Sequence, residues 1–259
     1  MTKTILVTGA TDGIGLLTAK KLAAAGHTVL LHGRSAEKLA KAAKEVGGTT
    51  ESFTADLSDL AQTAALADAI IAKLDHLDAL INNAGVLRLP NPITSSGLDA
   101  RFVVNTLAPY VLTQRLLSII PKTGRIVNLS SAAQAPVDVD AMVSGKAMDH
   151  MEAYAQSKLA ITIWTQELAA TLPTGPTVVA VNPGSLLASK MVKEGFGVAG
   201  NDLSIGADIL IKAALDESFA DKSGAYFDND SRRFAAPHGA AQDPEHCRAV
   251  MHGIEKLIS

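Results

Sequence analysis

The 259-residue chain has very little cysteine, few aromatic residues and no marked excess of either charge. Its single cysteine, Cys247, excludes a disulfide framework and a cysteine-based metal site. With 23 basic and 26 acidic residues, the chain lacks the basic face that a nucleic-acid-binding protein needs, so no nucleic-acid partner is expected. Its seven histidines show no ligand spacing such as H-E-x-x-H, so no metal site is predicted.

Long apolar segments are also missing. No apolar run approaches the ~18–20 residues that a membrane-spanning helix needs. Residues Met1–Thr4 lead directly into a strand-like run, which is unlike a secretory signal peptide, so we expect a soluble, cytoplasmic protein. Because no Pro-, Gly- or Ser-rich linker divides the chain, we expect a single domain over residues 1–259.

What the sequence does contain is a regular alternation of short apolar runs with segments of helical period. Strands are predicted at residues 4–8, 28–32, 52–54, 78–82, 125–129, 177–181 and 225–227. Helices are predicted at residues 14–25, 36–46, 58–74, 100–118, 152–171 and 245–257. This order indicates parallel βαβ units, so the fold class is α/β: one doubly wound, Rossmann-type domain with a mostly or fully parallel sheet of about seven strands. Residues 135–150 show little periodicity and are predicted to form a loop.

A glycine-rich turn connects the first strand to the first helix. Gly9, Gly13 and Gly15 would let backbone amides approach a pyrophosphate at the positive end of that helix. The spacing is G-x-x-x-G-x-G rather than G-x-G-x-x-G, but its place between strand and helix indicates nucleotide binding.

This turn resembles the cofactor motif of the short-chain dehydrogenases/reductases, and later segments resemble further motifs of that family. The matching segments, in the order expected for that family, are Thr8-Gly9-x-x-x-Gly13-Ile14-Gly15, Asn82-Asn83-Ala84-Gly85, Asn105, Ser131, Tyr154-x-x-x-Lys158 and Asn182-Pro183-Gly184. The resemblance covers essentially the whole chain. It implies an oxidoreductase that transfers a hydride between a nicotinamide cofactor and a carbonyl compound or alcohol.

Tyr154 and Lys158 are the candidate catalytic pair. They are four positions apart on a predicted helix, so both project from one face. A nearby ammonium group lowers the pKa of a phenol, which is ordinarily near 10, towards the range useful for acid–base catalysis. The resemblance assigns Tyr154 as general acid/base and gives Lys158 a second role at the nicotinamide ribose. It also implies that Ser131 binds the substrate oxygen and that Asn105 holds a water in the proton relay, with Ser130 as the adjacent alternative to Ser131.

The resemblance also implies a set of cofactor contacts. These are Gly9, Thr11, Asp12, Gly13, Ile14 and Gly15 in the turn; Asp56 and Leu57 near the adenine; Asn83, Ala84 and Gly85 at the adenosine ribose; and Tyr154, Lys158, Pro183, Gly184 and Ser189 towards the nicotinamide. The alternative for Asp56 is a solvated residue that caps the next helix.

The end of the second strand indicates that NADP(H) is favoured over NAD(H). Gly33 stands where relatives that prefer NAD carry the acid that binds the ribose 2′-hydroxyl. Arg34 can hold a 2′-phosphate through two hydrogen bonds, and Ser35 can add a hydroxyl donor. One departure is Asp12, because many NADP-preferring relatives have a basic residue there.

The long stretch between Ser131 and Tyr154 and the tail at residues 223–227 resemble the retinol-dehydrogenase-like branch, which includes carbonyl reductases. That branch implies a bulky, apolar aldehyde, ketone or alcohol as substrate. Residues 185–205 contain glycines and apolar residues and are predicted to form a mobile substrate lid. Family resemblance also implies a homodimer or homotetramer, formed through residues 100–118 and 152–171. Two alternatives stay open: a 3-oxoacyl-thioester reductase and a non-catalytic NADP(H)-sensing protein.

Overall fold

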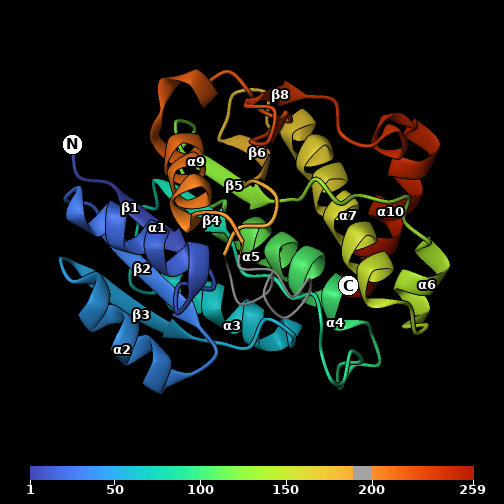
Figure 1. Ribbon diagram of the computed structural model, residues 1–259, viewed down its shortest axis with the longest axis horizontal. Helices are drawn as coiled ribbons and strands as arrows, with labels where there is room; N and C mark the ends of the chain where they lie inside the picture. The colour runs from blue at the N-terminus through green and yellow to red at the C-terminus, as the bar shows by residue number, and fades with distance from the viewer. Residues whose placement is uncertain (189–199) are drawn as a thin grey trace.

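The centre of the molecule is one sheet of eight strands, in the order β3-β2-β1-β4-β5-β6-β7-β8 (Figure 1). A computed structural model describes residues 1–188 and 200–259. The strands are β1 (Thr4–Val7), β2 (Thr28–Gly33), β3 (Thr50–Thr54), β4 (Ala79–Asn82), β5 (Arg125–Leu129), β6 (Thr177–Asn182), β7 (Tyr226–Asp228) and β8 (Arg233–Ala235). All neighbouring pairs are parallel except β7 with β8, which confirms the predicted doubly wound, mostly parallel sheet. The three-residue edge strand β8 was not predicted.

Helices cover both faces of this sheet. On one face lie α1 (Gly13–Ala24), α2 (Ala36–Val46) and α9 (Leu203–Leu215), and on the other α3 (Leu60–Ile71), α5 (Ala108–Leu116) and α7 (His150–Thr171). The remaining helical segments are α4 (Ala100–Phe102), η1 (Val103–Leu107), α6 (Val139–Ser144), η2 (Glu217–Phe219), η3 (Gly239–Gln242) and α10 (Pro244–Ile258). No helix in residues 1–188 and 200–259 has both the length and the apolar character needed to cross a bilayer.

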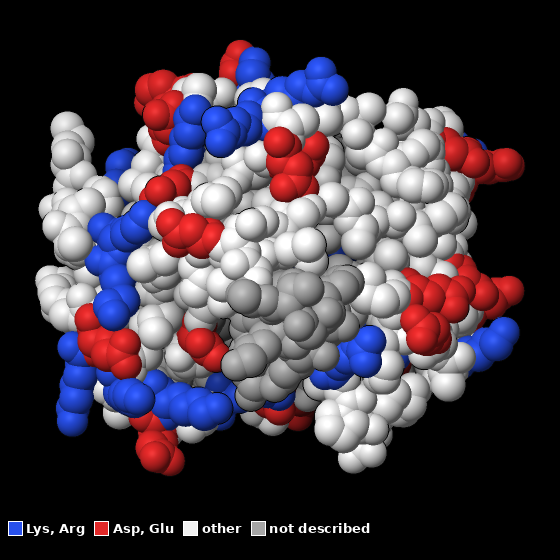
Figure 2. Space-filling view, in the orientation of Figure 1, with Lys and Arg blue, Asp and Glu red and all other residues white. Residues whose placement is uncertain are grey.

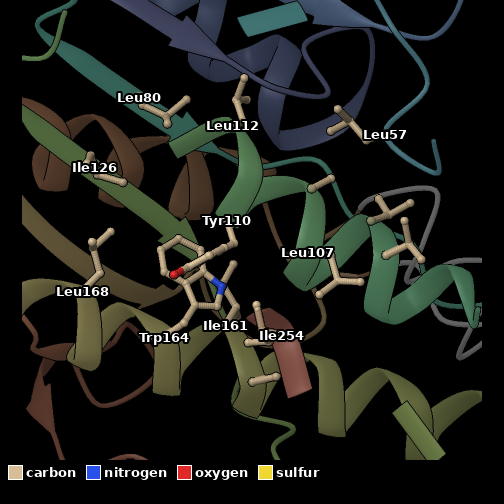
Figure 3. Packing of buried hydrophobic residues seen from close by; sticks show 14 of the residues in the cluster. Leu57, Leu80, Leu107, Tyr110, Leu112, Ile126, Ile161, Trp164, Leu168 and Ile254 are labelled. Atoms are coloured by element: carbon tan, nitrogen blue, oxygen red, sulfur yellow. The ribbon is translucent and has the colours of Figure 1, made fainter. Parts of the chain in front are cut away.

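Alternating side chains of the buried strands form two apolar cores. In β1, Ile5 and Val7 pack under α1 and α9, whereas Leu6 packs on the opposite face with α3, α5 and α7. Trp164 of α7 is fully buried in this second core, edge-on to Tyr110 with their ring centres 5.4 Å apart (Figure 3). This arrangement fixes the long helix α7 against the sheet.

The C-terminal helix α10 packs on α7 and α6. Ile254 of α10 is buried beside Ile161 and Trp164 of α7 (Figure 3). The expected homodimer or homotetramer remains a prediction. Part of the α7 surface that such an oligomer would use is covered by α10 of the same chain.

Three local structures differ from the sequence predictions. Residues 135–150 do not form only a loop, because they contain the short helix α6. Asp138 caps the start of α6, and Gly145, just after its end, adopts a left-handed conformation. This six-residue helix is too short to show a period. The next helix, α7, already begins at His150. The helix predicted from residue 58 begins at Leu60, because Asp59 is its cap.

The helix predicted over residues 100–118 is interrupted by the π-helical turn η1. Pro109 has no N–H with which to donate to the carbonyl of Asn105 four residues earlier. The regular hydrogen-bond ladder therefore breaks at Asn105. Such π-turns are frequent at functional sites.

Candidate active site

A cleft of about 830 Å³ opens at the carboxyl ends of the parallel strands. Most of the predicted site residues line it: Gly9, Thr11, Asp12, Gly13, Ile14, Gly15, Arg34, Asp56, Leu57, Asn83, Ala84, Gly85, Ser131, Tyr154, Lys158, Pro183 and Gly184. Ser35 and Asn105 do not line it, although Asn105 is hydrogen-bonded to the lining residue Val86. Ser189 and the middle of the expected 185–205 lid fall outside the described residues and stay predictions.

The glycine turn is held by Asn83. Its Nδ2 donates to the carbonyl oxygens of Thr8, at 2.8 Å, and Gly9, at 3.3 Å. A side chain at Gly15 would collide with this arrangement, because a Cβ there would lie 2.3 Å from the Gly9 carbonyl oxygen. Asp12 caps α1 by accepting from the Gly13 amide at 2.7 Å. The start of α1 is therefore packed tightly against Gly9 and the Asn83 side chain, with its positive end at the cleft.

His32, a residue that the sequence analysis did not select, connects this turn to β3. The Gly9 N–H donates to its Nδ1 at 3.3 Å, so Nδ1 must be unprotonated, and Nε2 lies 3.1 Å from the carbonyl oxygen of Ala55 as the donor. Burial lowers the pKa of His32 to about 4. The neutral ring thus holds two segments of the cofactor end of the cleft.

This shifted pKa predicts an acid-sensitive fold. The pKa of an unfolded histidine is 6.5, so between about pH 6.5 and pH 4 the unfolded chain binds a proton that the folded chain does not. Acidification through this window is expected to lower the free energy of unfolding by ~3 kcal/mol, as measured by urea denaturation. His32→Gln should flatten the dependence, whereas the control His252→Gln, an exposed site on α10, should preserve it. An equal slope in His32→Gln and the wild type would contradict the assignment.

Ser130 and Ser131 have different surroundings. Ser130 is 3% exposed, and its hydroxyl lies 3.1 Å from the carbonyl oxygen of Lys158 and 2.7 Å from the hydroxyl of Thr162. Ser131 is partly exposed in the cleft, with its hydroxyl close enough to Tyr154 to lower the pKa of that phenol. The alternation of β5 explains this, because it directs Ser130 towards α7. Of the two hydroxyls, that of Ser131 can reach a substrate.

Tyr154 and Lys158 lie on one side of α7, facing the cleft. The Lys158 Nζ is 5.6 Å from the centre of the Tyr154 ring and donates to the Leu129 carbonyl oxygen at 2.7 Å. Burial raises the pKa of Tyr154, and the hydrogen bond with Ser131 acts in the opposite direction. The expected lowering of the Tyr154 pKa is therefore wrong for the chain by itself, because the loss of solvation dominates. Burial lowers the pKa of Lys158 to about 8.

Asn105 lies on the π-turn, and its side chain binds protein atoms. Its Oδ1 accepts from the Val86 amide at 2.8 Å, and its Nδ2 donates to the Val86 carbonyl oxygen and to the Ser157 hydroxyl, both at 3.0 Å. The side chain thus fixes the cleft wall at Val86 to α7. If Asn105 binds a water as predicted, its backbone carbonyl oxygen is the atom available for it. That oxygen has no N–H donor four residues later, because residue 109 is a proline.

Two exposed cations line the cleft near the end of β2: Arg34, which follows the strand, and Lys38 in the first turn of α2. Lys38 was not predicted from the sequence, although its spacing of four residues from Arg34 is a signal that could have found it. Ser35 caps α2 by accepting from the Lys38 amide at 3.3 Å. Asp56 lines the cleft, and its carboxylate accepts from the amide and hydroxyl of Ser58. The cap of α3 is Asp59, so the helix-capping alternative for Asp56 is wrong, whereas its contact with the adenine stays a prediction.

Comparison with known proteins agrees with this geometry. Residues 3–196 match the family model described as short chain dehydrogenase. The chain belongs to the short-chain dehydrogenase family. It is 35% identical over 283 aligned residues to human retinol dehydrogenase 13, covering 99% of this chain and 84% of that protein. Such relatives confirm the retinol-dehydrogenase-like branch and make the chain an oxidoreductase of this family.

Solved structures of short-chain dehydrogenases share the fold. An uncharacterized protein from Mycobacterium paratuberculosis superposes with a TM-score of 0.82 at 28% identity, covering 99% of this chain and 93% of the other. A short-chain dehydrogenase from Burkholderia cenocepacia in complex with NADP gives a TM-score of 0.70 at 28% identity, covering 88% and 96%. This chain therefore has the same overall fold as these solved structures.

Proposed function

We propose that this oxidoreductase transfers a hydride between NADP(H) and a bulky, apolar aldehyde or ketone, or the corresponding alcohol, with Tyr154 as general acid/base. The observation that carries the proposal is the placement of Ser131, Tyr154 and Lys158 on one wall of the cleft whose opposite end carries Arg34 and Lys38. One end thus supplies proton transfer and the other supplies positive charge.

The residues of the cleft fit a dinucleotide phosphate. The N-terminus of α1 faces the cleft and favours an anion such as a pyrophosphate. Several basic side chains gather on the side of the molecule where α1 and α2 lie (Figure 2). A Cβ at Gly33 would lie 2.6 Å from the Thr11 methyl carbon, so the acidic side chain of NAD-preferring relatives has no room without displacing Thr11. These features support NADP(H) over NAD(H).

Removing the Arg34 charge is expected to weaken NADPH binding by about 10–100-fold, because a guanidinium–phosphate pair contributes roughly 1.5–3 kcal/mol. NADH binding should stay unchanged, since NADH lacks the 2′-phosphate. Titration calorimetry of Arg34→Leu with both cofactors measures the difference. Lys38→Met should weaken NADPH binding by only about threefold, because a lysine binds phosphate as a point charge rather than through two hydrogen bonds.

Lys41→Met is the matched control for these variants. Lys41 is exposed on the same helix, α2, but does not line the cleft. Its loss should leave both affinities unchanged. Equal weakening of NADH and NADPH by Arg34→Leu would show that Arg34 supports the fold of the cleft rather than the phosphate.

In the proposed mechanism, Ser131 donates a hydrogen bond to the substrate oxygen and Tyr154 donates its proton to it. NADPH, when bound, supplies the hydride that goes to the carbonyl carbon. The raised pKa of Tyr154 keeps the phenol protonated at neutral pH, ready to act as the acid in reduction. The Lys158 ammonium, fixed by the Leu129 carbonyl, stabilises the phenolate that remains. Asn105 holds the wall at Val86 in place.

The substrate end of the cleft is mainly apolar but also carries a cation, Arg88. Its apolar lining residues are Val86, Leu87, Leu89, Val104, Met151, Leu186 and Leu187. Such a wall favours a bulky apolar substrate, because binding removes both apolar surfaces from water.

The test is the decay of reduced-nicotinamide absorbance with NADPH, and separately with NADH, against aromatic and long-chain aldehydes and ketones. NADPH-dependent decay with these substrates is the expected result. Turnover with a 3-oxoacyl thioester alone would favour the thioester reductase instead. Tight NADPH binding without turnover of any of these compounds would favour a cofactor-sensing protein.

A further inference from the structure

Behind Ser131, on the side away from the cleft, lies a group of polar side chains that the proposed mechanism does not use. The backbone carbonyl oxygen of Ser131 accepts two hydrogen bonds, from the hydroxyl of Tyr226 at 3.0 Å and from Nε2 of Gln134 at 2.9 Å. Neither Tyr226 nor Gln134 lines the cleft. Two donors thus converge on the backbone of a residue that carries a proposed catalytic hydroxyl.

The orientation of the Gln134 side chain is fixed by a third contact. Its Oε1 accepts from the His238 amide at 3.0 Å, which leaves Nε2 as the atom that faces Ser131. Nε2 also lies 3.4 Å from the Ser130 hydroxyl. The amide therefore links the loop after β5 to the chain segment before η3.

Tyr226 comes from β7, 95 positions later in the sequence than Ser131. It is 6% exposed and is held in register beside Ala180 of β6. Burial and the charges of Asp228 and Asp230 raise the pKa of Tyr226, so its hydroxyl remains a donor. The strand pairing delivers this hydroxyl to a fixed position.

Ser131 itself is past the end of β5, where no ladder hydrogen bond fixes its outgoing peptide group. Its hydroxyl accepts from the Ala133 amide at 3.1 Å, so the side chain and the following peptide form one tight turn. Rotation of the carbonyl would rotate that turn and move the hydroxyl away from Tyr154. Two donors on the carbonyl oppose the rotation.

We propose that Tyr226 and Gln134 are positioning residues, which hold the backbone of Ser131 so that its hydroxyl faces Tyr154 and the substrate oxygen. This inference rests on the proposed function, since it concerns the same reaction. It extends the active site to β7, next to the edge strand of the sheet, and to the segment around His238.

The chain offers a set of matched variants, because Tyr110, Tyr154 and Tyr226 are its three tyrosines. Tyr226→Phe removes only the hydroxyl that binds Ser131. We expect kcat to fall about fivefold to tenfold, as for the loss of one hydrogen bond, while the NADPH dissociation constant is unchanged. Gln134→Met should give a similar loss. Tyr110→Phe, the same chemical change in the core around Trp164, should leave kcat unchanged.

Two further readouts separate positioning from a general structural role. In a Ser131→Ala background, Tyr226→Phe should change kcat less than twofold, because the hydroxyl that it positions is absent. The Ser131 hydrogen bond lowers the pKa of Tyr154, so loosening Ser131 should shift the pH profile of kcat to higher pH. Melting curves establish that each variant is folded, and Gln134→Met carries the test if Tyr226→Phe is not.

The outcomes are distinct. A kcat for Tyr226→Phe and Gln134→Met equal to that of Tyr110→Phe overturns the inference. A full fivefold to tenfold loss from Tyr226→Phe in the Ser131→Ala background overturns it as well, since the effect would not pass through the Ser131 hydroxyl. A wild-type chain without turnover on any carbonyl substrate overturns the proposed function, and the inference with it.

Discussion

Tyr154→Phe is expected to lower kcat by about 10²–10⁴-fold and to leave the dissociation constant of NADPH unchanged. The substitution removes one hydroxyl, the proposed proton donor, and keeps the ring that packs beside Lys158. Because Tyr154 faces the substrate end of the cleft, the contacts at Arg34 and Lys38 are untouched. Stopped-flow turnover and fluorescence titration with NADPH measure the two quantities.

The control is again Tyr110→Phe, which should retain full turnover. Its phenol lies against Trp164 in the core, outside the cleft (Figure 3). A Tyr154→Phe variant with nearly normal kcat would mean that another group delivers the proton. The Ser131 hydroxyl would then be the nearest candidate, and Ser131→Ala would decide.

Lys158→Met is expected to abolish turnover and to stabilise the fold at the same time. Lys158 is 4% exposed, and burial lowers its pKa from 10.5 to about 8. Keeping it charged at pH 7 therefore costs the folded state ~3 kcal/mol. Methionine removes this cost, although the Leu129 carbonyl loses a donor worth ~1 kcal/mol. We expect a net gain of ~2 kcal/mol in the free energy of unfolding at about pH 7.

The gain should depend on pH with a definite sign. Below pH 8 the wild-type lysine is charged in both states, and the full penalty is present. As the pH rises from 8 towards 10.5, the folded lysine loses its proton before the unfolded one, so the wild type recovers stability and the difference shrinks. Urea denaturation at two pH values measures this, with Lys41→Met as the exposed control. A Lys158→Met variant less stable than the wild type at pH 7 would contradict the assignment.

The parallel sheet could be predicted from the sequence because each buried strand is a short apolar run between helical segments. The position of the cleft could be predicted from the same alternation of strands and helices, since the carboxyl ends of parallel strands meet at one edge of the sheet. The choice between Ser130 and Ser131 was harder, because a strand's alternation predicts opposite directions without saying where the strand ends. The structure shows that the pairing with α7 continues through Ser130.

Other features depend on contacts between distant residues, which local patterns do not encode. His32 meets Gly9 and Ala55, each 23 positions away in sequence, and Tyr226 meets Ser131 across 95 positions. One omitted feature did have a local signal. Pro109, four residues after Asn105, predicts a broken helix at that asparagine, because proline cannot complete the helical hydrogen bond.

The position of the proposed catalytic pair on α7 has a consequence for how activity is lost on heating. Every residue from Gln156 to Thr165 on this helix is buried, and Trp164 anchors it in the larger core. Segments that form the core become solvent-accessible only when the whole domain opens, unlike surface loops. Tyr154 and Lys158 therefore keep their mutual geometry for as long as the chain is folded. We therefore expect thermal inactivation to follow global unfolding, so that the fraction of remaining turnover reports the fraction of folded molecules.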